Sequence, residues 1–152
     1  MKRFDFRLQP ILNHREYLER VAKQNTARAQ MDVVQCENRI SDLNNTLDRQ
    51  ARKFENELEQ GISAFEFRQH CDYLDDVETT MKQERERKIK LSGILREKLM
   101  ELKKKTIDKK AMELYRERLK NEYTQTILAI EQKEMDEISS LKTARKLSNE
   151  AS

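Results

Sequence analysis

The stretch Gln60-Gly61-Ile62-Ser63 decides the fold, because one helical pattern stops there and another begins. Gly61 suits the left-handed residue that commonly ends a helix, since glycine adopts a positive φ without a steric penalty. Ser63 and Glu66 have the spacing of a capping box, in which each side chain satisfies a backbone donor at a helix start. The stretch therefore predicts a tight turn between two helices.

The composition supports this interpretation. Of the 152 residues, 39% are charged and 36% are hydrophobic, and the chain has only two glycines and one proline. Few helix breakers together with abundant Glu, Lys, Arg and Leu are typical of coiled coils. We therefore expect an all-α fold: an elongated antiparallel two-helix coiled-coil hairpin with unequal arms, forming one domain over residues 1–152.

The helix limits follow from local signals. Pro10 is tolerated in a first turn, where its missing N–H costs nothing, so the first helix should begin near Gln9. We expect helix 1 over about residues 8–59, the turn at 60–63, helix 2 over about 64–143, and a flexible tail at 144–152.

Apolar residues at alternating steps of three and four predict the seam between the helices. If the hairpin folds about Gly61, residue i faces roughly residue 122 − i. Glu84 and Lys88 fill seam positions between apolar runs. The predicted seam of helix 1 is Leu8, Ile11, Leu18, Ala22, Asn25, Ala29, Val33, Cys36, Ile40, Leu43, Leu47, Gln50 and Phe54, and that of helix 2 is Leu74, Val77, Met81, Leu91, Leu95, Leu102, Met112, Leu119, Tyr123 and Ile130.

The second helix should be longer than the first and extend beyond its start. About 30 residues from Tyr115 onward are then left with little or no partner in the chain. They still carry an apolar face, which invites another protein, although a frayed tail is the alternative. The residues of that face are Leu119, Tyr123, Ile127, Ile130, Met135, Ile138 and Leu141.

The same register places three further features. Cys36 falls near Arg85 and Cys71 near Ala51, so the thiols are too far apart for a disulfide. With two histidines and no paired ligand spacing, a metal site is not expected. Gly93 faces the region of Ala27 and Ala29, whose side chains are small, which favours close backbone approach over a functional kink.

Positive charge is concentrated on helix 2, although the net charge of the whole chain is only +3. We call its densest lysines the basic waist. A solvated helix face is the first interpretation, an acidic protein partner the second, and nucleic acid the last, because no base-reading motif accompanies the charge. The waist comprises Lys103, Lys104, Lys105, Lys109 and Lys110.

Nothing in the sequence indicates catalysis or a cofactor. The chain lacks a glycine-rich phosphate loop, a nucleophile motif and a plausible carboxylate pair, so we expect it not to be an enzyme. No apolar stretch approaches the roughly 20 residues that span a bilayer, and the N-terminus lacks the apolar run of a secretory signal. These features predict a cytoplasmic protein.

Three segments resemble the flagellar FliJ family. The stretch Phe4-Asp5-Phe6-Arg7-Leu8-Gln9-Pro10-Ile11-Leu12, leading into Arg15-Glu16, looks like the start of these proteins. The segment Tyr73-Leu74-Asp75-Asp76-Val77-Glu78 resembles the family's segment after the turn, and Gln132-Lys133-Glu134-Met135-Asp136-Glu137-Ile138 resembles its closing motif. The resemblance spans nearly the whole chain in order, spacing and length.

This resemblance implies a stalk-like component of the flagellar type III export apparatus. Family members form an antiparallel two-helix coiled coil, insert into the ring of the export ATPase FliI and promote its hexamerisation. They also contact the export gate protein FlhA and handle empty export chaperones. Such a role implies peripheral association with the inner membrane at the export apparatus, and links to flagellum biogenesis and chemotaxis.

The resemblance also implies site residues. The gate-binding face would include Leu43, Tyr73 and Val77, although Thr46 and Gln50 stand where relatives can carry Tyr. The ATPase-ring contacts would come from the terminal end of the hairpin, at Tyr123, Ile130, Met135 and Ile138. Two alternatives remain open: a generic cytoplasmic helical-hairpin adaptor, and a nucleic-acid-binding coiled coil that uses the basic waist.

Overall fold

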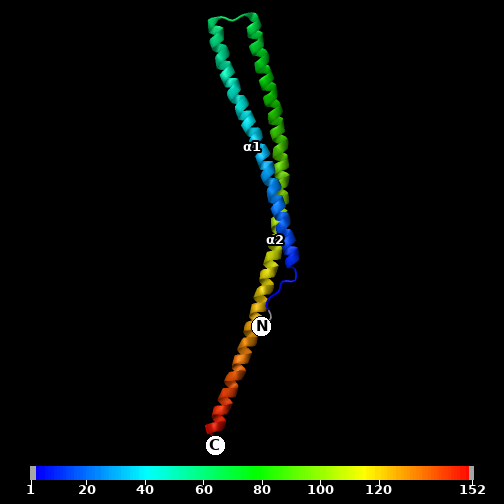
Figure 1. The fold of residues 1–152 in the computed structure, drawn as a ribbon, viewed down its shortest axis with the longest axis vertical. Helices are drawn as coiled ribbons and strands as arrows, with labels where there is room; N and C mark the ends of the chain where they lie inside the picture. The colour runs from blue at the N-terminus through cyan, green and yellow to red at the C-terminus, as the bar shows by residue number, and fades with distance from the viewer. Residues whose placement is uncertain (1–2, 151–152) are drawn as a thin grey trace. The chain divides into compact units, whose positions relative to one another are not determined.

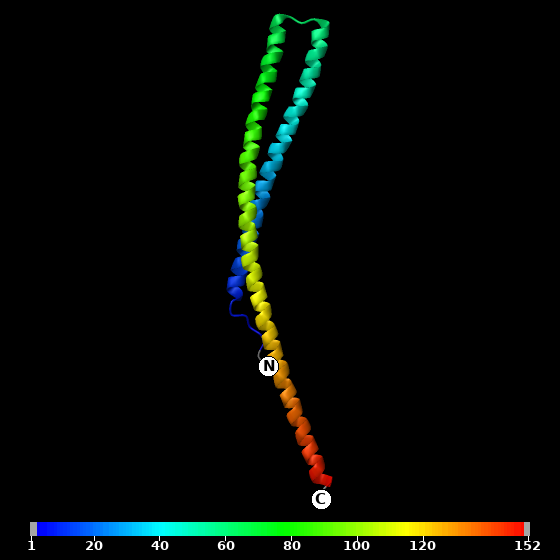
Figure 2. The same ribbon diagram turned by 180° about the vertical axis from the view of Figure 1, so that it is seen from behind.

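A computed structural model describes residues 3–150, with the backbone alone at Glu150. The described residues form two helices, α1 over Gln9–Gln60 and α2 over Ala64–Glu150, with 52 and 87 residues. Figure 1 shows the two helices and their single connection, and Figure 2 shows the same arrangement from behind. This part of the chain contains no strand, so the predicted all-α helical hairpin with unequal arms is confirmed.

The turn forms as its sequence predicts. Gly61 has a φ of 85°, and its N–H donates to the carbonyl of Leu58 over 3.2 Å, which closes the end of α1. The Ser63 N–H donates to Glu66 Oε2 over 2.9 Å, and the Glu66 N–H donates to Ser63 Oγ over 3.2 Å. These reciprocal bonds satisfy donors that the start of α2 would otherwise leave without partners.

The chain packs as two compact units. The hairpin unit spans Tyr17–Lys105 and contains the turn with its flanking helices. The terminal unit combines Met1–Glu16 with Thr106–Ser152, of which residues 3–16 and 106–150 are described. The single domain over residues 1–152 that we expect from the sequence stays a prediction.

Contacts within the hairpin unit establish the antiparallel pairing. The Thr26 hydroxyl lies 3.2 Å from the carbonyl of Lys98, and the Cys36 thiol lies 3.2 Å from the carbonyl of Glu84. Both pairs agree with the expected rule that residue i faces roughly residue 122 − i. The predicted register therefore holds well away from the turn.

The core of the hairpin unit is a thin line of small and medium side chains. Most of its buried members are spaced by three, four or seven residues along each helix, as a coiled-coil seam requires. A thin seam explains why few residues are fully enclosed, because two helices alone cannot surround a side chain. The hydrophobic members under 9% exposed are Ala22, Ala29, Val33, Cys36, Val77 and Met81.

Two of the packing expectations are wrong. The spacing predicts Ile11 in the seam, but Ile11 is 45% exposed, whereas its neighbour Leu12 is fully buried at 0%. The register predicts close backbone approach at Gly93, yet a Cβ at this position would meet nothing within 4 Å. The helix continues through Gly93, and a side chain there would face open space.

The second helix ends later than the sequence predicts. Instead of stopping near residue 143, α2 continues to Glu150. Residues 144–150 are therefore helical where we expect a flexible tail. The last part of that expected tail, at residues 151–152, lies outside the described residues.

In the terminal unit, the segment before α1 folds against α2. The Phe4 ring lies 5.7 Å from that of Tyr123, and the Phe6 ring lies 6.3 Å from that of Tyr115. Phe6 is itself only 7% exposed, so its ring is part of the core of this unit. These contacts hold the segment along one face of α2 as far as Tyr123.

Candidate functional site

The most prominent candidate surface is an apolar face of α2 beyond Tyr123. Ile130 and Ile138 are each 48% exposed, and Leu141 is 61% exposed. At 3.6 residues per turn these side chains fall within an arc of about 80°, on the same side of α2 as Tyr123. We call Ile127, Ile130, Ile138 and Leu141 the inner terminal face.

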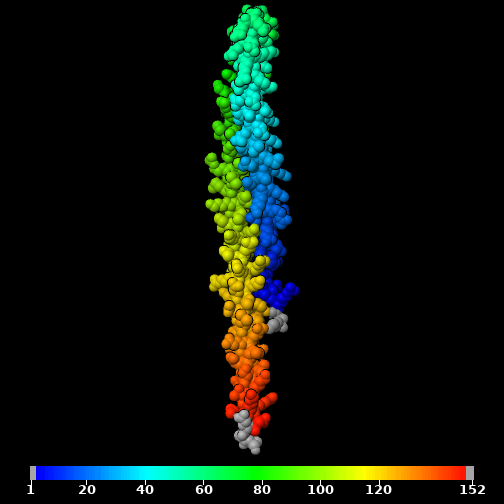
Figure 3. All heavy atoms as spheres, turned by 90° about the vertical axis from the view of Figure 1, so that its left-hand side faces the viewer, coloured from blue at the N-terminus to red at the C-terminus, as the bar shows by residue number. Residues whose placement is uncertain are grey.

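This surface begins later than the sequence predicts. We expect α2 to lack partners from about Tyr115 onward, but Phe6 and Phe4 pack against Tyr115 and Tyr123. The expectation is wrong for residues 115–123, because it counts only paired helices and not the extended segment before α1. Figure 3 shows the orange-to-red part of α2 running on beyond the described residues of the N-terminal segment.

The four predicted ATPase-ring residues do not form one patch. Tyr123 packs against Phe4, whereas Ile130 and Ile138 lie on the inner terminal face. Met135, which is 64% exposed, lies about 140° round the helix axis from Ile130 and borders the face only beside Ile138. The structure therefore groups Ile130 with Ile138 and leaves Met135 outside that face.

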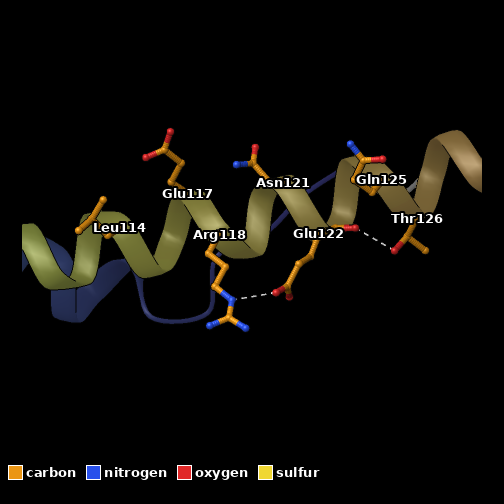
Figure 4. Close-up of a pocket in the computed structure, with 7 residues that line it drawn as sticks. All are labelled: Leu114, Glu117, Arg118, Asn121, Glu122, Gln125 and Thr126. Carbon is orange, nitrogen blue, oxygen red and sulfur yellow. Dashed lines mark hydrogen bonds and ion pairs between the residues drawn. The ribbon is translucent and has the colours of Figure 1, made fainter.

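Another side of α2 forms a second exposed surface. Figure 4 shows Glu117, Asn121 and Gln125 projecting from one side of the helix. Arg118 Nε lies 3.0 Å from Glu122 Oε1 on the same helix. All seven lining residues in Figure 4 come from α2, so the surface is a shallow helix face and not an enclosed reaction site.

The predicted gate-binding residues differ in accessibility. Tyr73 is 44% exposed, Leu43 is half-buried beside Thr80, and Val77 is only 8% exposed. Val77 belongs to the core of the hairpin unit, so it supports the helix pair and presents little surface to a partner. Tyr73 and Leu43 are the accessible members of the set.

The basic waist is largely open to solvent. Lys103, Lys104 and Lys110 are exposed, while Lys105 and Lys109 are half-buried. Lys109 Nζ lies 3.8 Å from Glu113 Oε1, in a pair of the kind that contributes little to stability. The waist thus provides positive charge along α2.

A polar cluster interrupts the seam of the hairpin unit around Glu84. The Cys36 thiol donates to the Glu84 carbonyl over 3.2 Å, and Glu84 Oε1 lies 3.7 Å from guanidinium nitrogens of both Arg39 and Arg87. Burial raises the pKa of the Cys36 thiol, and a second hydrogen bond from the thiol, to Glu84 Oε2 over 3.4 Å, raises that pKa further. Cys36 is therefore held as a neutral thiol, which disfavours reactivity.

An aromatic cluster lies near the turn, and the heptad pattern alone does not reveal it. The Phe54 ring lies 5.3 Å from that of Phe67 and 5.0 Å from that of His70, and His70 Nε2 contacts Glu57. The register rule is the signal that finds this cluster, because it pairs residue 54 with residues near 68. The cluster braces the two helices beside the turn.

The described residues offer no metal-ligand cluster, because no group of three or more His, Cys, Asp or Glu side chains among them could hold a metal ion. Neither helix has a described stretch that is both long and apolar enough to cross a membrane.

The fold and these surfaces define a helical hairpin with exposed apolar and charged faces. A family model described as "Flagellar FliJ protein" matches residues 4–148. The chain belongs to the flagellar FliJ family, whose members are components of the flagellar type III export apparatus.

The chain is also similar to a solved structure, that of a putative YscO homolog from Chlamydia trachomatis. The sequence identity is 18%, the match covers 91% of this chain and 94% of that chain, and the TM-score is 0.41. No curated protein sequence matches the chain.

Proposed function

We propose that the chain is the stalk-like component of the flagellar export apparatus and that its inner terminal face docks inside the ring of the export ATPase FliI. The observation that carries this proposal is the exposure of Ile130, Ile138 and Leu141 on the side of α2 that Phe4 covers at Tyr123. An apolar helix face left open in one chain is a common docking element for another protein.

The energetics favour such docking. Each square ångström of apolar surface removed from water contributes about 25 cal/mol, so covering several large side chains can offset part of the cost of association. The basic waist adds positive charge that can steer α2 towards an acidic surface of the ring. Promotion of hexamer assembly follows if one helix contacts several ATPase subunits at once.

The hairpin unit is proposed to contact the export gate protein FlhA. Tyr73 and Leu43 are its accessible candidate residues, with Val77 supporting them from the core. Handling of empty export chaperones and peripheral association with the inner membrane belong to the same proposal.

The docking proposal is tested by adding the chain to FliI with nucleotide and measuring hexamer formation by negative-stain imaging and ATP hydrolysis. The double variant Ile130→Asp with Ile138→Asp should lose most of the stimulation, because two carboxylates would enter the apolar contact. Leu128→Asp is the matched control, since Leu128 is 52% exposed and lies on the opposite side of α2 from Ile130. Full stimulation by the double variant would refute the proposal.

A further inference from the structure

We propose that the outer face of α2 pairs with the same face of a second copy of this chain, with the two helices antiparallel and centred near Asn121. The surface consists of one residue in every seven along α2, and we call it the outer stripe. Its members are Ile107, Leu114, Asn121, Leu128 and Met135.

The apolar members of the outer stripe are well exposed. Ile107, Leu114, Leu128 and Met135 are 58%, 57%, 52% and 64% exposed. A seven-residue spacing keeps side chains on one side of a helix that supercoils with a neighbour. Four large apolar side chains on one side of a helix form a surface that another helix can cover.

The stripe lies away from the face that the N-terminal segment covers. Phe6 and Phe4 pack against Tyr115 and Tyr123, which lie on one side of α2. At 3.6 residues per turn, the middle of the stripe is about 160° round the helix axis from the middle of that covered face. The N-terminal segment and a second copy of the chain can therefore occupy α2 at the same time.

The order of residues in the outer stripe is symmetric about Asn121. Leu114 and Leu128 lie seven residues on either side of it, and Ile107 and Met135 lie fourteen on either side. In an antiparallel pair centred on Asn121, Leu114 of one copy lies opposite Leu128 of the other, and Ile107 lies opposite Met135. The amide of Asn121 can donate to and accept from its own copy, which fixes the alignment at one point.

Charge along α2 favours this orientation over the parallel one, with Lys103, Lys104 and Lys110 the lysines nearest the stripe. Residues 103–110 contain five lysines and one aspartate, for a net charge of +4, whereas residues 131–138 contain four acidic residues and one lysine, for a net charge of −3. An antiparallel pair sets each basic segment beside the acidic segment of the other copy. A parallel pair would set like charges together and be disfavoured.

The self-pairing leaves most of the inner terminal face open. Between Ile107 and Met135, only one residue in every seven belongs to the outer stripe, so the contact between the two copies is narrow. We therefore expect a reversible dimer whose population rises with protein concentration. Because Ile130 and Leu141 lie on a different side of α2 from Leu114 and Leu128, loss of self-pairing and loss of ATPase stimulation are separable results.

Sedimentation equilibrium of the full chain tests the pairing. The apparent mass should rise with concentration towards twice that of one chain, and Leu114→Asp with Leu128→Asp should return it to that of a monomer. Leu141→Asp, at an exposed leucine on the inner terminal face, is the matched control and should still dimerise. A wild-type chain that stays monomeric at every accessible concentration would overturn the proposal.

Cross-linking tests the orientation with the apolar stripe largely intact. In a Cys71→Ser background, a short bis-maleimide should join chains carrying Leu114→Cys to chains carrying Leu128→Cys, and Asn121→Cys chains to one another. Strong cross-linking of Leu114→Cys chains to themselves, without the mixed product, would indicate parallel pairing and contradict the inference.

Discussion

In the hairpin unit and in the terminal part of α2, apolar residues recur at the same helical spacing, but they are buried in the first and exposed in the second. In the hairpin unit, Val33, Cys36, Val77 and Met81 are all less than 9% exposed, because each helix covers the seam of the other. Beyond residue 131, every side chain described on α2 is exposed. The same spacing of apolar residues stabilises the fold where a second helix is present and leaves the side chains exposed where the structure describes none.

The largest expected effect compares one methionine from each region. Met81→Ala should lower the free energy of unfolding by about 2 kcal/mol or more, because it removes a buried side chain and leaves a cavity. Met135→Ala should change it by less than about 0.5 kcal/mol, since Met135 is exposed. Urea denaturation followed by circular dichroism measures both, and equal losses would break the comparison.

The two glycines should respond with opposite signs. Gly61→Ala should destabilise the turn by about 1 kcal/mol, because alanine is strained at a positive φ. Gly93→Ala should stabilise α2 by about 1 kcal/mol, since a Cβ there meets open space and alanine favours helix. Thermal unfolding of the two variants checks both signs, and a destabilised Gly93→Ala variant would restore the packing explanation.

The smallest expected effect is on the loss of folding stability at acidic pH. Hydrogen bonds from the Ser63 backbone N–H, and then from its side chain, lower the pKa of Glu66. The folded state therefore binds this proton less readily than the unfolded state, so the stabilisation is present at neutral pH and is lost as pH falls through the carboxyl range. Glu66→Gln should show a flatter loss of stability between about pH 5 and pH 3. An unchanged pH profile would remove Glu66 from this account.

The sequence predicts most of the fold because its signals are local. Gly61, Ser63 and Glu66 specify the turn, and the distance from that turn specifies which residues face one another. The same count places the polar residue Lys88 in the seam, where its Nζ lies 3.0 Å from Glu37 Oε1.

The errors arise because the spacing of apolar residues predicts where a residue lies along a helix, but not which way its side chain points. Ile11 and Leu12 are adjacent apolar residues, and only the rotation of α1 against α2 decides which is buried. Phe6 covers Tyr115 from a segment that precedes the helix and so follows no helical register. The register places Gly93 opposite residues near Ala29 of α1, but a side chain at Gly93 would point to open space.

Hydrogen exchange along α2, with and without FliI and nucleotide, tests most directly the central claim that its terminal part is a docking surface. Alone, amides in residues 128–150 should exchange much faster than those in residues 74–102, because no second helix stabilises them. Addition of the ATPase should slow exchange in residues 128–150. Unchanged exchange there, with protection appearing only near the turn, would contradict the account.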